Sequence, residues 1–150
     1  MRLPVPVRVR WSDLDAYGHV NNASLLTLLE EARVSAFWAG GPEGSPSTAV
    51  IDAGHGASSL TVIARQSAEY LAQIPHHREP IIVETWIGRM GGASLEICYE
   101  VHSPDRSVLY ARAQTTVVML DAASGSPRRL TPQERAAWQP YLEEPVDFRR

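Results

Sequence analysis

Residues 11–22 read WSDLDAYGHVNN, and this polar run separates a strand-like pattern from a helix-like pattern. Before it, over residues 5–11, valines alternate with proline and arginine, which is the period of a half-buried β-strand. After it, over residues 23–39, apolar residues recur at helical spacing. The sequence therefore predicts a strand that leads through a polar loop into a long helix.

The predicted helix over residues 23–39 carries apolar side chains on two of its sides. The main stripe consists of Leu25, Leu28, Leu29, Ala32 and Ala36. The second stripe consists of Thr27, Glu31, Val34 and Trp38. Because both stripes need cover, we expect the helix to be packed on more than one side. We expect Asn21 or Asn22 to cap its first turn and Gly40-Gly41-Pro42 to end it.

Four further strands are predicted after a loop over residues 42–57. Their ranges are 59–71, 80–88, 94–102 and 108–120. Glycine- or proline-containing turns at residues 90–93 and 103–106 predict hairpins, and hence antiparallel pairing. This order of elements predicts an α+β fold in which an antiparallel sheet wraps around a long central helix.

In two of the predicted strands, the sequence indicates which side chains share one face of the sheet. Leu60, Val62 and Ala64 share one face of residues 59–71. Residues 94–102 alternate between an apolar face and a polar face, and Cys98 lies on the polar one. The tail after residue 121 is charged and proline-rich, with one helical turn predicted at residues 132–138.

Composition bounds the class of protein. The 150 residues include 14 Lys and Arg against 17 Asp and Glu, so the formal net charge is −3, which argues against a nucleic-acid partner. No apolar run approaches 18 residues and the first residues lack a signal-peptide pattern, so no membrane partner is expected. The single Cys98 cannot form an internal disulfide or a cysteine metal site. These features are typical of a cytoplasmic protein of about 16.5 kDa without a metal or cofactor.

The polar loop before the helix has the makings of a reaction site. The first amides of a helix lack internal partners, so they can stabilise negative charge such as an oxyanion. A carboxylate on the loop could act on the same carbon as a base or nucleophile. From the residues alone, however, carboxylates beside a helix start are more often turn formers or partners of the helix dipole.

The motif Asp13-x-Asp15-x-x-Gly18-His19-Val20-Asn21-Asn22, followed by a helix with Glu30-Glu31-Ala32-Arg33, resembles a known family. It looks like the hotdog-fold acyl-CoA thioesterases, and most like the 4-hydroxybenzoyl-CoA thioesterase-like branch. The resemblance covers residues 3–121 and implies a single hotdog thioesterase domain over residues 1–150. It also implies a homodimer or homotetramer with each active site at a subunit interface.

The resemblance assigns roles within the loop. Asp15 matches the catalytic aspartate, acting as nucleophile or as general base on water, and Asn22 supplies a backbone amide to the thioester carbonyl. Gly18 fits a tight turn that needs a positive φ or a close approach. Substrate-facing positions are Tyr17, Gly18, His19, Asn21 and Leu25. Leu25 stands where relatives often carry an aromatic residue, which favours an aliphatic pocket.

Other polar residues have competing interpretations. Asp13 is expected to hold the loop through backbone amides, and His19 to be a spacer more than a proton shuttle. Because coenzyme A carries phosphates, we expect one or two of Arg65, Arg89 and Arg128 to bind it. The adjacent His76 and His77 lack neighbouring ligands at metal-binding spacing.

The leading functional hypothesis is hydrolysis of an acyl-CoA thioester to a free acid and CoA. A thioesterase acting on acyl carrier protein is one alternative, which a basic patch at the site entrance would favour. Enoyl-thioester hydration fits less well, since hotdog hydratases place a histidine five residues after an aspartate and this chain does not. A non-catalytic hotdog protein that binds acyl-CoA is the remaining alternative.

Overall fold

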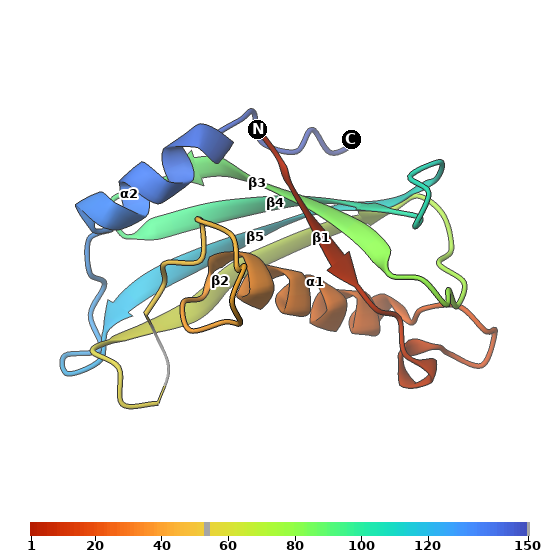
Figure 1. Ribbon diagram of the computed structural model, residues 1–150, viewed down its shortest axis with the longest axis horizontal. Helices are drawn as coiled ribbons and strands as arrows, with labels where there is room; N and C mark the ends of the chain where they lie inside the picture. Colours follow the sequence, from red (N-terminus) through yellow and green to blue (C-terminus); the bar gives the residue numbers. More distant parts are fainter. Residues whose placement is uncertain (53–54, 150) are drawn as a thin grey trace.

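Five antiparallel strands and one long helix form the framework of the computed structural model, which describes residues 1–52 and 55–149 (Figure 1). The strands are β1 (Leu3–Val7), β2 (Ser59–Tyr70), β3 (Ile81–Met90), β4 (Ser94–His102) and β5 (Leu109–Asp121). Their order in the sheet is β1-β3-β4-β5-β2, so β1 and β2 form the edges. The predicted α+β class and antiparallel sheet are confirmed, and residues 53–54 of the predicted loop lie outside the described residues.

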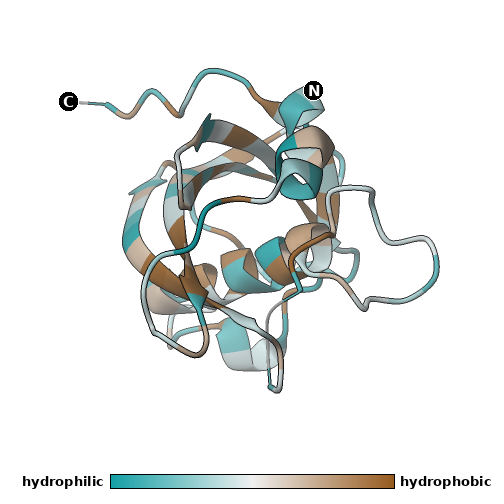
Figure 2. Ribbon diagram, turned by 90° about the vertical axis from the view of Figure 1, so that its left-hand side faces the viewer, coloured by the Kyte–Doolittle hydropathy of each residue, from teal (hydrophilic) through white to brown (hydrophobic). Residues whose placement is uncertain are grey.

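The long helix α1 (Asn22–Phe37) begins where the polar loop ends. The Asn21 side chain caps it by accepting a hydrogen bond from the Ala23 amide at 2.8 Å, which decides between the two predicted caps. The sheet curves around this helix, as the end-on view in Figure 2 shows. The predicted range of 23–39 is correct to within two residues at each end.

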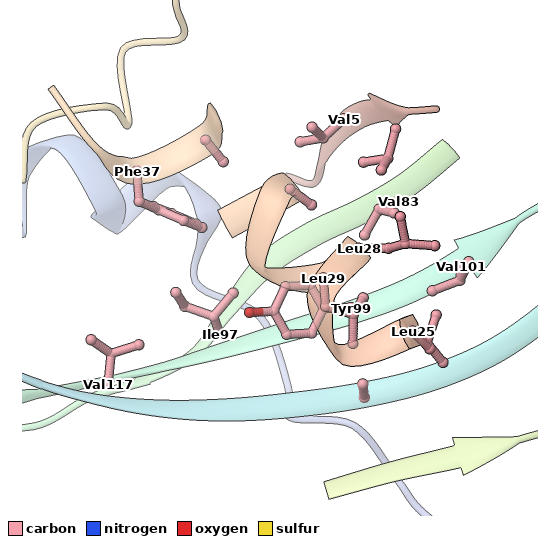
Figure 3. Close-up of a cluster of buried hydrophobic side chains, with 14 of the residues drawn as sticks. Val5, Leu25, Leu28, Leu29, Phe37, Val83, Ile97, Tyr99, Val101 and Val117 are labelled. Atoms are coloured by element: carbon pink, nitrogen blue, oxygen red, sulfur yellow. The ribbon is translucent and has the colours of Figure 1, made fainter. Parts of the chain in front are cut away.

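The core lies between α1 and the concave face of the sheet. Leu25, Leu28 and Leu29 of α1 are almost completely buried and lie opposite residues of β3, β4 and β5 (Figure 3). Burying one such leucine contributes about 1.5–3 kcal/mol. The main predicted stripe is therefore confirmed as the core face of the helix. The second stripe is different, because Thr27, Glu31 and Val34 are exposed in the single chain.

A short C-terminal helix closes one end of the core. Helix α2 (Pro132–Trp138) matches the predicted helical turn, and a reciprocal capping box between Thr131 and Glu134 begins it. The Trp138 indole is fully buried, donates a hydrogen bond to the Thr48 carbonyl at 2.9 Å and packs edge-on against Phe37. The tail thus covers the end of α1.

The first strand is shorter than predicted. Strand β1 ends at Val7 and not at residue 11, and Trp11–Asp13 form a 3-10 turn. Val9 is still buried, with 2% exposure. The alternating pattern therefore predicted correctly which side chains are buried. It placed the end of the strand too late, because pairing with β3 stops at Val7.

On two strands, β2 and β4, the burial of the outward-facing side chains differs from what the alternating pattern predicts. Leu60 and Val62 of β2 share one face as predicted, but this face is exposed to solvent. Cys98 is on the outward face of β4 and yet is fully buried, because the C-terminal residues around Pro145 and Val146 lie over it. Burial raises the pKa of the Cys98 thiol to about 11, so the thiolate is disfavoured.

No helix within residues 1–52 and 55–149 is both long enough and apolar enough to cross a membrane.

Candidate active site

The polar loop before α1 is a narrow hairpin closed by backbone hydrogen bonds. The Asp15 amide donates to the His19 carbonyl and the Asn21 amide donates to the Asp13 carbonyl, both at 2.8 Å. The Val20 amide donates to the Ile74 carbonyl at 2.8 Å, which fastens the loop to the segment between β2 and β3. Asp15 and the start of α1 are therefore held on the two arms of one short, anchored loop.

Asp13 holds the base of this loop. Its buried carboxylate accepts the Arg10 amide at 2.7 Å and forms an ion pair with the Arg10 guanidinium at 2.8 Å. Burial opposes the charged form, but the hydrogen bonds and charge of Arg10 hold the pKa of Asp13 below its usual value. The predicted contact between Asp13 and a backbone amide is present.

Asp15 is partly exposed and uses one carboxylate oxygen within the loop. Its Oδ1 accepts the Tyr17 amide at 2.9 Å and lies 3.4 Å from the His19 amide. No hydrogen bond to the other oxygen, Oδ2, is found in the described part of the chain. The carboxylate is thus oriented by the turn and keeps one oxygen for another partner.

The tip of the loop carries three of the predicted substrate-facing residues. Tyr17 has 86% of its surface exposed. Gly18 has φ +78°, and a Cβ placed on it would meet nothing within 4 Å, so the turn needs glycine for its dihedral angle and not for close packing. His19 pairs through its backbone with Pro75, and its buried Nδ1 has no partner among the described residues.

A pocket of about 240 Å³ lies at the N-terminal end of α1. Its lining residues are Val20, Asn22, Leu25, Tyr70, Leu71, Ala72, Gln73, Ile74, Tyr110 and Ala111. Asn22 and Leu25 from the predicted set meet here, whereas Asp15 and the loop tip are not part of the lining. Leu28 and Leu29 are core residues and do not line the pocket.

The start of α1 presents an unpaired amide at this pocket. Asn22 is the first residue of the helix, and its amide donates no hydrogen bond within residues 1–52 and 55–149. The Tyr70 hydroxyl donates to the Asn22 carbonyl at 2.8 Å and thereby ties the end of β2 to the helix start. The positive end of the helix dipole also favours negative charge at this point.

The arginines considered for coenzyme A are not among the residues that line this pocket. Arg89 lies near the end of β3 that leads into the turn to β4. Arg65 follows a bulge in the middle of β2. Arg128 donates to both oxygens of Glu134, at 2.9 and 3.0 Å, and to the Ser59 hydroxyl at 2.7 Å. Arg128 therefore has a structural role that the sequence did not indicate.

Three side chains could in principle hold a cation. Among the described residues, ligand atoms of Glu84, Glu100 and His102 lie within 4.8 Å of one another. The Arg2 guanidinium lies 3.1 Å from Glu100 and 3.5 Å from Glu84, and the Arg106 guanidinium lies 3.4 Å from Glu84. Guanidinium groups thus already supply the positive charge that these two carboxylates require.

The two tyrosines that line the pocket were not identified from the sequence. Tyr70 and Tyr110 come from the far end of β2 and the near end of β5, and only the folded sheet brings them to the start of α1. No local motif marks either tyrosine, so spacing along the chain could not have identified them.

Comparison with known proteins places the chain in a family. The model of the thioesterase-like superfamily matches residues 9–146, and the chain belongs to this superfamily. Its antiparallel sheet around a central helix is the hotdog fold that the resemblance implied.

Individual proteins are similar to this chain over different parts of its length. The PA2801 protein of Pseudomonas aeruginosa is 28% identical, with a TM-score of 0.75 over 91% of this chain and 98% of that one. A thioesterase of Thermus thermophilus, solved with coenzyme A and zinc, is also 28% identical, with a TM-score of 0.71 over 92% of each chain. Protein YsmA of Bacillus subtilis is 31% identical over 94 residues, which are 62% of this chain. The matched part is 56% of YsmA, so the chain spans just over half the length of that curated relative.

Proposed function

We propose that the protein hydrolyses an acyl-CoA thioester to a free acid and coenzyme A. The observation that carries the proposal is the unpaired amide of Asn22, a residue that lines a largely apolar pocket. An acyl chain fits the apolar lining, while the amide and the helix dipole favour a developing oxyanion. Superfamily membership supports thioester hydrolysis as the class of reaction, and the Thermus relative solved with coenzyme A supports a CoA thioester.

In the proposed reaction, Asp15 acts on the carbonyl carbon by one of two routes. As a base, it takes a proton from water while the water oxygen attacks the carbon. As a nucleophile, its own oxygen attacks and forms a mixed anhydride that water then hydrolyses. In both routes the C–S bond breaks and coenzyme A leaves as a thiolate, which then takes up a proton.

The surrounding residues position the substrate for this step. The Asn22 amide donates to the thioester oxygen, and its bond strengthens as negative charge develops. Leu25 lies at the buried side of the pocket and limits the acyl chain, and the aliphatic residues Val20 and Ile74 add apolar surface. Tyr17, His19 and Asn21 belong to the loop that holds Asp15 and are proposed to lie along the substrate.

A turnover screen tests the proposal. Purified protein is incubated with straight-chain acyl-CoAs of increasing length, an aromatic acyl-CoA and an acylated carrier protein, and the released thiol is measured. We expect hydrolysis of at least one acyl-CoA. Hydrolysis of the carrier-protein substrate alone would instead favour the carrier-protein alternative. Tight binding of acyl-CoA with no release of thiol would identify a binding protein and contradict the proposed hydrolysis.

A further inference from the structure

Besides the pocket at the start of α1, the molecule has a groove rich in arginine beside the active-site loop. It measures about 560 Å³, and the polar and aromatic residues that line it are Arg8, Arg10, Trp11, His76, His77 and Arg78. They come from the segment after β1 and from the segment between β2 and β3, which lie at the same end of the sheet in Figure 1. The Arg8 guanidinium donates to the Arg78 carbonyl at 3.0 Å and links the two segments.

The positive charge of this groove is only partly neutralised. Arg10 pairs with the buried Asp13. In the described part of the chain, no carboxylate lies within 4.0 Å of the guanidinium of Arg8 or Arg78, and both residues are exposed. Two guanidinium groups therefore remain available for an anion in a protein whose net charge is −3. Guanidinium groups bind phosphate oxygens particularly well.

The same groove offers an aromatic surface. The rings of Trp11 and His76 are stacked, with centroids 3.9 Å apart and an angle of 5° between their planes. Even so, 74% of the Trp11 surface is exposed, although a tryptophan is normally largely buried. A flat ring held in place by a stacked neighbour and open to solvent is suited to stacking against a nucleobase.

The groove adjoins the pocket at the start of α1. His77 lines the groove and Tyr110 lines the pocket, and the His77 Nε2 atom lies 2.8 Å from the Tyr110 hydroxyl. The contact between these two side chains thus connects the wall of the groove to the wall of the pocket. A long ligand with an apolar end and an anionic end could occupy both.

We propose that this groove binds the phosphorylated adenosine end of the coenzyme A substrate. Trp11 stacks on the purine, and Arg8 and Arg78 bind its phosphates. The inference rests on the proposed function, since the thioester end would lie in the pocket beside Asn22. It assigns the coenzyme A phosphates to residues other than Arg65, Arg89 and Arg128. An acidic carrier protein would use the charge of the groove but not its stacking surface.

A binding experiment tests the groove without any turnover. Adenosine 3′,5′-bisphosphate, the nucleotide portion of coenzyme A without its diphosphate link, is titrated while tryptophan fluorescence is recorded. Of the four tryptophans, Trp86 and Trp138 are buried, so a purine that stacks on the exposed Trp11 should quench the signal. We expect saturable quenching that Trp11→Ala abolishes. Absence of quenching in the wild type, or equal quenching in Trp11→Ala, would overturn the proposal.

Kinetics then separate this proposal from the proposed function. For an acyl-CoA, Trp11→Ala should raise KM about tenfold and Arg78→Gln about fivefold, with kcat nearly unchanged. Arg129→Gln makes the same charge change at an exposed residue near the opposite end of the sheet and should leave KM unchanged. With an acyl-N-acetylcysteamine, which has no nucleotide, both groove variants should match the wild type.

The outcomes are distinguishable. Wild-type hydrolysis of acyl-CoA with unchanged KM in both groove variants would refute the groove and leave the proposed function intact. No hydrolysis of either thioester would refute the proposed function, while quenching by the bisphosphate would still support the groove. A KM increase in Arg78→Gln for an acylated carrier protein, without quenching by the bisphosphate, would overturn the proposal in favour of a protein partner.

Discussion

The hydroxyl of Tyr70 donates a hydrogen bond of 2.8 Å to the carbonyl oxygen of Asn22, so the end of β2 is tied to the first residue of α1. This contact joins the edge of the sheet to the point where we place the oxyanion donor. It also sets the position of two residues that line the pocket. The geometry of the site therefore depends on the sheet as well as on the polar loop.

Replacing Tyr70 by Phe removes this hydrogen bond and keeps the ring. We expect the free energy of unfolding to fall by about 0.5–1.5 kcal/mol, the usual net value of one hydrogen bond. Denaturant unfolding measures the change. Tyr17→Phe is the matched control, because Tyr17 is 86% exposed and should lose almost no stability. Equal stability of Tyr70→Phe and the wild type would show that the contact contributes nothing.

Replacing Leu25 by Phe should shorten the acyl chain that the protein accepts. Leu25 is 1% exposed and lines the pocket, so added volume there occupies space meant for the substrate. The overpacking should cost about 1–3 kcal/mol of stability. Leu29→Phe is the control, since Leu29 is equally buried but lies outside the pocket lining. Rates over a series of acyl-CoAs should shift toward shorter chains in Leu25→Phe only; the same shift in both variants would place the acyl pocket elsewhere.

The sequence predicted the bounds of β4 and α2 correctly and those of the other long elements to within a few residues, because their patterns coincide with real burial. It failed at β1, where Val9 is buried in the core although it lies beyond the last residue that pairs with β3. Periodicity reports which side chains are covered, but not what covers them. Cys98 illustrates the converse, since a distant tail covers an outward strand position that alternation marks as exposed.

The site was only partly predictable for a related reason. The loop residues from Asp13 to Asn22 are close together in the sequence, so a sequence motif could identify them. Tyr70 and Tyr110 are 40 positions apart and meet only because β2 pairs with β5. The pairing of Arg128 with Glu134 of α2 was not predictable either, because no motif links the two residues.

Replacing Glu134 by Gln should destabilise the fold by about 2–3 kcal/mol, because a nearly buried ion pair with Arg128 and a helix cap are weakened together. Burial opposes the charged form, but the hydrogen bonds from Arg128 and Thr131 hold the pKa of Glu134 below its usual value. A lowered folded-state pKa stabilises the protein above the unfolded-state pKa of about 4.3. The difference in the free energy of unfolding between Glu134→Gln and the wild type should therefore have its full value at pH 7. It should shrink as the pH falls below about 4. A difference that does not depend on pH would contradict this assignment.

We expect the protein to be a homodimer or homotetramer. Strand β2 is an edge of the sheet, and Leu60, Val62 and Ile63 on it are between 39% and 44% exposed. An open edge with exposed apolar side chains favours association with a second copy. Light scattering at micromolar concentration should report at least two chains. Val62→Lys should shift the mass toward one chain, whereas a stable wild-type monomer would contradict the expectation.

The central claim is that the Asp15 carboxylate performs the chemistry, and the turnover of folded Asp15→Asn on the best acyl-CoA substrate tests it most directly. Asn keeps an oxygen that can accept the Tyr17 amide, so the loop should survive while the negative charge is lost. Asp13→Asn is the control and should lose stability through its contacts with Arg10 but retain most turnover. We predict that kcat falls by about 10²-fold or more in Asp15→Asn, the scale of a positioned base. Turnover at the wild-type rate by folded Asp15→Asn would contradict the account.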